Sequence, residues 1–131
     1  MTGLDSWYAY MKSHDRAEAA KALWELLHPD AVFESPVVHS PQRGRDITFK
    51  YLASAEKVLG GPGFSYVGEW RSADGAVLEF KTMIDGIEIN GVDIITFDAG
   101  GRITRFKVMV RPLKAINMLH RLMAEQLAAQ S

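Results

Sequence analysis

The stretch Gly86–Pro112, GIEINGVDIITFDAGGRITRFKVMVRP, decides the fold of this 131-residue chain. Two runs in which apolar and polar residues alternate flank the turn sequence DAGG, a pattern that is typical of a β-hairpin. If Phe97 pairs with Arg102, then Asp93 lies opposite Phe106. The hairpin face that holds Asp93 is otherwise mainly apolar, with Ile87, Ile89, Ile95, Phe97, Phe106, Val108 and Val110. Burying a carboxylate there is costly, so we expect Asp93 to have a partner, a proton or a functional role.

Composition favours a single globular domain over residues 1–131. The net charge is −1 and acidic and basic residues are interspersed, so we expect neither nucleic acid nor a membrane as a partner. The absence of cysteine excludes disulfides and thiolate chemistry. The N-terminus lacks a basic region followed by an apolar run, and no apolar run is long enough to span a membrane. We therefore expect a cytoplasmic protein.

Apolar residues at helical spacing predict three helices before the first long strand run. They cover residues 4–11, from Asp15 to about Leu27, and from Asp46 to about Leu59. Asp15 and Asp46 are expected to cap the second and third helices. Between these two helices the sequence predicts a short strand, Ala31–Glu34, and a loop with two prolines, Ser35–Gly44. The three tryptophans, Trp7, Trp24 and Trp70, are expected mainly in the core.

Four strands and a last helix follow the glycine-rich break at residues 60–63. Alternation predicts strands over residues 64–71 and 77–84 and through both arms of the hairpin, and apolar spacing predicts a helix over residues 113–127. In the first of these strands Tyr66 and Trp70 are expected on one face and Glu69 on the other. Strands joined by tight turns form an antiparallel sheet, and helices must cover its apolar face. The predicted fold class is α+β.

Three segments of this chain resemble the nuclear-transport-factor-2-like superfamily, which includes ketosteroid isomerases, SnoaL-like polyketide cyclases and limonene epoxide hydrolases. They are LLHPDAVFESPV, RGRDITFKYL and VDIITFDAGGRI. The resemblance spans essentially the whole chain. It implies a cone in which a strongly bent, mixed or antiparallel sheet wraps three N-terminal helices, with an additional C-terminal helix. It also implies an apolar pocket at the open end and a homodimer through the outer face of the sheet.

The resemblance implies roles for a few residues, which we take position by position. Asp93, in VDI, matches the proton-bearing aspartate that stabilises an oxyanion in ketosteroid isomerases. Tyr10 lies near the place of their donor tyrosine, and Tyr8 competes for it. Ser35 occupies the place of their general-base aspartate. The region around Phe106 has no counterpart of the cyclases' acid on the last strand, and the arginine-flanked acids of the epoxide hydrolases have no counterpart either.

The predicted site therefore combines two catalytic candidates with a larger set of ligand-binding candidates. Asp93 and Tyr10 are the catalytic candidates. The ligand-binding candidates are Tyr8, Ser35, Phe80, Ile95, Phe106, Val108 and His39. A structural alternative for Asp93 is a core acid that accepts hydrogen bonds from a buried tyrosine or tryptophan. We expect no metal, because no pair of residues has ligand spacing with an acid nearby, and no cofactor.

Two functions are consistent with this site. The first is an apolar pocket for a small hydrophobic carbonyl or hydroxyl compound, on which a cofactor-independent isomerisation, cyclisation or hydrolysis could take place. The second is a non-catalytic ligand-binding or dimerisation module that has lost the family's general base. Asp93 favours the first and Ser35 favours the second, and the fold alone cannot choose between them.

Overall fold

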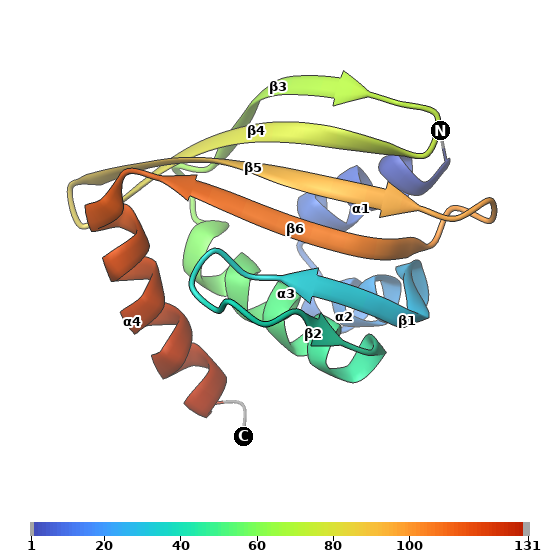
Figure 1. The fold of residues 1–131 in the computed structure, drawn as a ribbon, viewed down its shortest axis with the longest axis horizontal. Helices are drawn as coiled ribbons and strands as arrows, with labels where there is room; N and C mark the ends of the chain where they lie inside the picture. Colours follow the sequence, from blue (N-terminus) through green and yellow to red (C-terminus); the bar gives the residue numbers. More distant parts are fainter. Residues whose placement is uncertain (1, 130–131) are drawn as a thin grey trace.

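Four helices and a six-stranded sheet make up residues 2–129, the part of the chain that this computed structural model describes (Figure 1). The elements are α1 (Thr2–Lys12), α2 (Arg16–Leu26), β1 (Leu27–Glu34), β2 (Gln42–Arg43), α3 (Arg45–Leu59), β3 (Ser65–Arg71), β4 (Gly75–Ile84), β5 (Ile87–Phe97), β6 (Ile103–Arg111) and α4 (Leu113–Ala129). The predicted α+β class, the three N-terminal helices and the C-terminal helix are confirmed.

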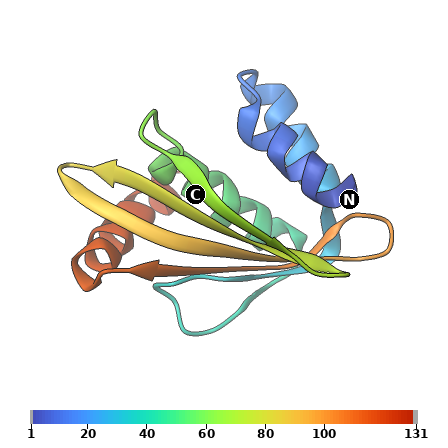
Figure 2. The same cartoon turned by 90° about the horizontal axis from the view of Figure 1, so that it is seen from above.

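The sheet is mixed and open, with the strand order β2-β1-β6-β5-β4-β3. β1 runs parallel to β6, and every other neighbouring pair is antiparallel. Figure 2 shows α1, α2 and α3 on the same side of the sheet. α4 begins where β6 ends and contacts α3, β5 and β6. The helices therefore cover one face of the sheet, the inner face, and leave the other, the outer face, without cover from a helix.

The core lies between the inner face and the helices. Its largest fully buried side chains include Phe33, Phe80 and Phe106 from three different strands and Leu4 and Leu23 from α1 and α2. Burying side chains of this size is the main favourable term in folding. Within residues 2–129, no helix is long and apolar enough to cross a membrane.

The two predicted helix caps have different outcomes. Asp15 caps α2, because its side chain accepts hydrogen bonds from the backbone N–H groups of Ala17 and Glu18. Asp46 does not cap α3. The N-cap residue is Gly44, which has a positive φ of 110° and no side chain that could accept a bond. Asp46 lies instead in the first turn of the helix, where a carboxylate still interacts favourably with the helix dipole.

The hairpin of β5 and β6 is confirmed, but its predicted register is wrong. Asp93 pairs with Val108, two residues beyond the expected partner, and Phe97 pairs with Ile103 rather than Arg102. One of these two residues comes from a longer turn, because Phe97 pairs with Ile103, and the other comes from a bulge beside it, where β6 takes in one extra residue. Between Asn90 and Thr96 the shift is two residues, which returns each paired side chain to its original face, so the apolar face around Asp93 forms as predicted.

β3 differs from its prediction in a way that changes faces. Tyr66 pairs with Phe80, but the register then slips by one residue, and Glu69 pairs with Leu78. Beyond this bulge, Glu69 shares the inner face with Leu78, and Trp70 points to the outer face with 58% of its surface exposed. The expected grouping of Trp70 with Tyr66 is therefore wrong, because a one-residue slip exchanges the two faces of a strand.

The other differences are local. Trp7 is buried as predicted, whereas Trp24 is exposed and lies under the guanidinium group of Arg45. β1 begins at Leu27, earlier than predicted, and the same guanidinium group donates two hydrogen bonds to the Leu27 carbonyl oxygen, at 2.6 and 3.0 Å. The proline loop contains the short strand β2. On α4, Leu119 is buried as expected.

Candidate functional site

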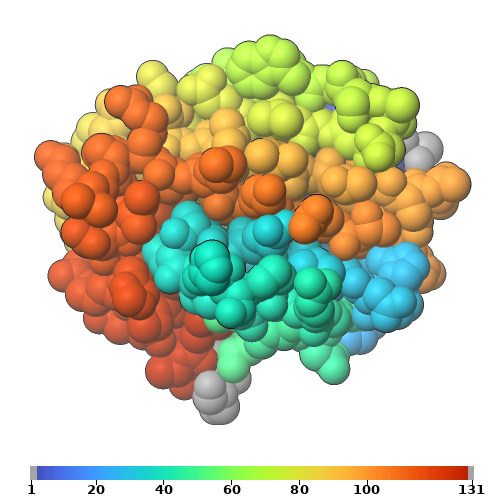
Figure 3. Space-filling model, viewed as in Figure 1, coloured from blue at the N-terminus to red at the C-terminus, as the bar shows by residue number. Residues whose placement is uncertain are grey.

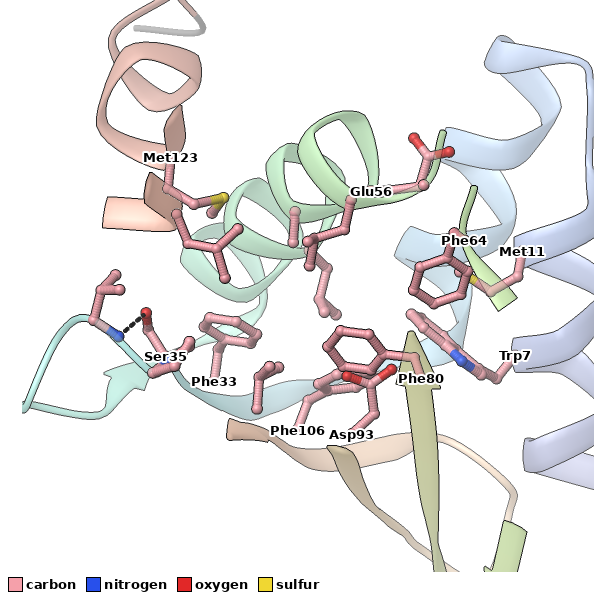
Figure 4. Close-up of a pocket in the computed structure, with 18 of the residues that line it drawn as sticks. Trp7, Met11, Phe33, Ser35, Glu56, Phe64, Phe80, Asp93, Phe106 and Met123 are labelled. Carbon is pink, nitrogen blue, oxygen red and sulfur yellow. Dashed lines mark hydrogen bonds between the residues drawn. The ribbon is translucent and has the colours of Figure 1, made fainter. Parts of the chain in front are cut away.

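A mostly apolar cavity of about 60 Å³ lies between the inner face of the sheet, α3 and α4 (Figure 4). Its wall includes aromatic side chains from α1, β1, β3, β4 and β6, and Leu119 and Met123 from α4. The aromatic members are Trp7, Phe33, Phe64, Tyr66, Phe80 and Phe106. Figure 4 shows the carboxyl group of Asp93 between Phe80 and Phe106, directed toward this space. A site of this composition suits an apolar molecule with one polar group.

Asp93 occupies the middle of β5 and has 7% of its surface exposed. Its neighbours across the sheet are Leu78 on β4 and Val108 on β6, both buried. The alternation of β5 places this carboxyl on the inner face with Ile95, as the sequence predicted.

Asp93 has a hydrogen-bond partner that sequence analysis did not select. The hydroxyl group of Tyr66, on β3, donates to Oδ2 of Asp93 at 2.6 Å. The same phenol oxygen accepts a hydrogen bond from Nε1 of Trp7, on α1, at 3.0 Å. Within residues 2–129, no side-chain hydrogen bond reaches the second carboxyl oxygen, Oδ1. Oδ2 is thus hydrogen-bonded to the protein, whereas Oδ1 is available to a molecule in the cavity.

The acid–base properties of this pair follow from burial. Burial raises the pKa of Asp93 to about 7, and the hydrogen bond from Tyr66 opposes that rise. Burial, followed by the charge of Asp93 and the hydrogen bond to it, holds the pKa of Tyr66 well above its usual range. Desolvation therefore dominates at Asp93, as expected for a carboxyl group in apolar surroundings without a cationic partner. Asp93 can hold a proton close to neutral pH.

The structure brings five of the predicted site residues to the cavity. They are Asp93, Ser35, Phe80, Phe106 and Val108. The Oγ atom of Ser35 accepts a hydrogen bond from the backbone N–H of Val37 at 3.1 Å. This bond stabilises the turn after β1, and the Ser35 hydroxyl group accepts it from a residue of the same turn.

The other four predicted residues do not line this cavity. Tyr10 is buried with its ring 5.2 Å from that of Trp7, and burial, with a smaller effect of the Glu56 charge, raises the pKa of Tyr10 to about 12. The hydroxyl group of Tyr8 donates to Glu69, and its ring meets Tyr66 edge-on.

Ile95 is a fully buried core residue on the same face as Asp93. His39 is exposed and lies at a separate hollow on the outside of the proline loop. Neither residue contributes to the wall of the cavity.

Tyr66, Trp7 and Glu56 line this cavity but were not among the residues predicted from the sequence. The period-2 pattern of residues 64–71 predicted the face of Tyr66 but not its partner. Glu56, from α3, lies at the edge of the cavity, and Figure 4 shows its carboxyl group far from Asp93. Its Oε2 pairs with Arg16 at 2.9 Å. The described part of the chain holds no cluster of three or more His, Asp or Glu side chains that could bind a metal ion.

Comparisons with known proteins identify the family of this chain. Residues 4–106 match the family described as the SnoaL-like domain. No curated protein matches this chain. Among solved structures, a steroid delta-isomerase from Pseudomonas aeruginosa is 35% identical, with a TM-score of 0.88, and the match covers 98% of this chain and 91% of that one.

Two further structures are more distant. A protein with a cystatin-like fold from Silicibacter pomeroyi is 28% identical, with a TM-score of 0.75, over 82% of this chain and 74% of that one. An NTF2-like protein of unknown function from Mesorhizobium loti is 22% identical, with a TM-score of 0.65, over 84% and 91%, and shows the fold alone. The family match and the identity to the Pseudomonas protein agree with the observed cone. The chain belongs to the SnoaL-like domain family.

Proposed function

We propose that this protein binds a small apolar molecule with a carbonyl or hydroxyl oxygen in the cavity, and that Asp93 binds that oxygen. The observation that carries the proposal is the arrangement of the Asp93 carboxyl group. Oδ2 is held by Tyr66, while Oδ1 has no protein partner within residues 2–129 and belongs to a group that lines an apolar wall. Oδ1 is therefore open to the cavity, and a ligand oxygen that reaches it can form a hydrogen bond in apolar surroundings, where such bonds are stronger than in water.

The protonation state of Asp93 decides which oxygen it binds best. With a pKa of about 7, Asp93 is largely neutral in mildly acidic solution and can donate a hydrogen bond to a carbonyl oxygen. That bond strengthens as the oxygen becomes an oxyanion, as in an enolate. The identity to a steroid delta-isomerase supports the corresponding reaction, a cofactor-independent isomerisation by proton transfer next to a carbonyl group.

A second function, ligand binding without catalysis, is favoured by the groups around Asp93. A proton transfer needs a base besides the oxyanion donor. Ser35 stands where the resemblance places that base, and its hydroxyl group is hydrogen-bonded to Val37. Glu56, the second acid at the cavity, pairs with Arg16.

The size of the cavity restricts the first probes. A cavity of about 150 Å³ holds benzene, whereas this one measures about 60 Å³. Butanone, an acceptor with five heavy atoms, is therefore a suitable first probe. Ketones of increasing size would measure how far the cavity opens.

Binding is tested by following carboxyl and backbone NMR signals during a butanone titration at pH 6. We expect shifts at Asp93 and at its neighbours on β5 and β6, and a loss of affinity in Asp93→Leu, which removes both carboxyl oxygens. Glu88→Gln, an exposed change on the opposite face of β5, is the matched control and should bind like the wild type. Equal affinity in Asp93→Leu would contradict the proposal.

Catalysis is tested with the same probe in deuterated water. An isomerase site should exchange the hydrogens next to the butanone carbonyl faster than buffer alone, and Asp93→Leu should abolish the difference. Binding without exchange would establish the second function, a binding module, in place of the first.

A further inference from the structure

Three side chains from three different elements form one hydrogen-bonded chain beneath the cavity. Trp7 on α1 is joined to Tyr66 on β3 at 3.0 Å, and Tyr66 is joined to Asp93 on β5 at 2.6 Å. The direction of this chain is fixed by chemistry, because an indole N–H can only donate. The phenol oxygen accepts from Trp7, and an ionised carboxylate can only accept, so the phenol hydrogen is directed to Oδ2 of Asp93 when Asp93 is ionised.

The direction of the chain assigns different roles to the two carboxyl oxygens. In the structure Tyr66 donates to Oδ2, and we take this bond to be kept when Asp93 is neutral. When Asp93 is protonated, its proton must therefore be on Oδ1, the oxygen without a protein partner in residues 2–129. The ligand then meets an O–H donor at Oδ1 when Asp93 is neutral and an acceptor at the same place when Asp93 is ionised.

We propose that Tyr66, held by Trp7, is a positioning residue that reserves Oδ1 of Asp93 for the ligand and so lets one site take two ligand classes. The neutral site takes a hydrogen-bond acceptor such as a ketone or an oxyanion. The ionised site takes a donor, such as an alcohol or an alkylammonium ion whose charge compensates that of Asp93. This inference rests on the proposed function, because it assumes that the ligand reaches Asp93.

The surroundings of Asp93 leave Tyr66 as its one close ionisable neighbour among the described residues. β4 and β6 place Leu78 and Val108 beside it. α4 contributes only the apolar Leu119 and Met123 to the cavity. On α3, Glu56 lies at the edge of the cavity and pairs with Arg16.

On α1, Tyr8 meets the ring of Tyr66 and not Asp93, and its hydroxyl group donates to Glu69. Glu69 in turn pairs with Arg71 at 2.6 Å. The negative charge of Glu69 is thus neutralised by Arg71, and neither residue lines the cavity. Tyr8 is thus a second phenol beside Tyr66 that makes no contact with Asp93, which suits it as a control.

The aromatic wall is compatible with both ligand classes. Rings of phenylalanine, tyrosine and tryptophan bury the apolar part of any small ligand, and their faces also attract an alkylammonium ion. Because burial raises the pKa of Asp93 to about 7, the exchange between the two classes should occur near neutral pH.

The positioning role is tested first in the ligand-free protein by NMR titration of the Asp93 carboxyl carbon. Tyr66→Phe removes the hydrogen bond that favours the ionised form, so the pKa of Asp93 should rise, by about one unit. Trp7→Phe should raise this pKa less, because Tyr66 still donates to Asp93 but no longer accepts the hydrogen bond from Trp7 that strengthens its own. Tyr8→Phe should leave it unchanged. An unchanged or lower pKa in Tyr66→Phe, or an equal rise in Tyr8→Phe, would overturn the positioning role.

A second measurement covers the case in which Trp7→Phe does not fold. In Tyr66→Phe the Nε1–H signal of Trp7 should move to the position of a free indole N–H, because its acceptor is gone. A signal that stays in place would show that the two residues are not joined, and would overturn the chain.

The ligand classes are tested with butanone and sec-butylammonium, which share a carbon skeleton and differ in offering an acceptor or a donor. Between pH 5.5 and 8.5 the affinity for butanone divided by that for sec-butylammonium should fall at least about tenfold in the wild type. The midpoint of this fall, the crossover, should move to higher pH in Tyr66→Phe. A crossover that stays in place would overturn the specificity role. If neither probe binds at any pH, the proposed function fails together with that role, while the carboxyl titration still decides the positioning role.

Discussion

At the scale of single residues, the burial of Asp93 links the stability of this protein to pH. The unfolded chain releases this proton at its ordinary pKa of 3.8, whereas the folded protein keeps it up to about pH 7. Between these values the folded state binds more protons, so the free energy of unfolding should fall as pH rises from about 4 to about 7 and then level off. The contribution of Asp93 to this fall is at most about 4 kcal/mol.

Asp93→Asn removes the ionisable group and keeps an acceptor for Tyr66. We expect it to match the wild type in stability near pH 4 and to exceed it at pH 8, because the wild type must then bury a charge. Urea unfolding across this pH range measures the difference. Glu88→Gln, exposed on the other face of β5, should show no such divergence. A constant difference between Asp93→Asn and the wild type would mean that Asp93 titrates alike in both states.

The sequence located Asp93 but not its partners. Strand alternation alone put this carboxyl on an apolar face, and it is buried there. Tyr66 was not identified as its partner, because the pairing of β3 depends on a bulge that period-2 alternation does not reveal. The resemblance pointed to Tyr10, but that ring packs on Trp7, and Tyr66 donates to Asp93 instead.

At the scale of elements, α4 closes the cavity and should contribute strongly to stability. Ala115, Met118, Leu119 and Met123 are buried on one side of this helix. Leu119→Ala should lower the free energy of unfolding by about 2–5 kcal/mol, because it removes packed atoms and enlarges a cavity. Deletion of everything after Pro112 should lower the melting temperature sharply.

Thermal and urea unfolding measure both changes on α4. Lys114→Ala, on the exposed side of the same helix, is the matched control and should cost little. An unchanged melting temperature and full solubility after the deletion would show that α4 covers no apolar surface of importance.

The elements themselves were largely predictable, because long periodic segments such as β5 and α3 carry strong signals. The bulges were not, and two of them have different consequences. The longer β5–β6 turn and the bulge beside it together shifted the register by two residues and preserved the faces around Asp93, whereas the bulge in β3 shifted it by one and exposed Trp70. The cap of α3 also escaped prediction, because a glycine with positive φ replaced the expected carboxylate of Asp46.

At the scale of the whole molecule, we propose that two copies associate through the outer face of the sheet, part of which Figure 3 presents. Three large apolar side chains on this face are exposed: Trp70 (58%), Met83 (58%) and Met109 (55%). Charged residues accompany them, including an ion pair between Glu34 and Arg105 at 2.6 Å. Between them the register places Val77 beside Ile94 and Val92 beside Met109, and such a mixture of apolar and charged side chains suits a two-fold interface with a polar rim.

Light scattering at micromolar concentration should therefore give twice the chain mass of 14.6 kDa. Ile94 and Lys107 lie directly opposite each other on β5 and β6, and Ile94→Asp together with Lys107→Glu should produce monomers. Lys114→Ala, outside the sheet, should leave the mass unchanged. A monomeric mass for the wild type would contradict association through this face.

The cone was predictable from the order of its elements, but the size of its cavity was not. Cavity volume depends on how closely α4 and the proline loop approach the sheet, which no local pattern in the sequence encodes. The site was therefore expected as a pocket for a hydrophobic compound, while the structure limits the space to about 60 Å³.

The central claim is that Asp93 holds its proton near neutral pH and uses it to bind a ligand oxygen. NMR titration of the Asp93 carboxyl carbon, with and without saturating butanone, tests both parts in one experiment. The account predicts a pKa of about 7 in the free protein and a higher value with butanone, because a ligand that binds only the protonated form raises the pKa. A pKa at or below the ordinary 3.8, unaffected by butanone, would contradict it.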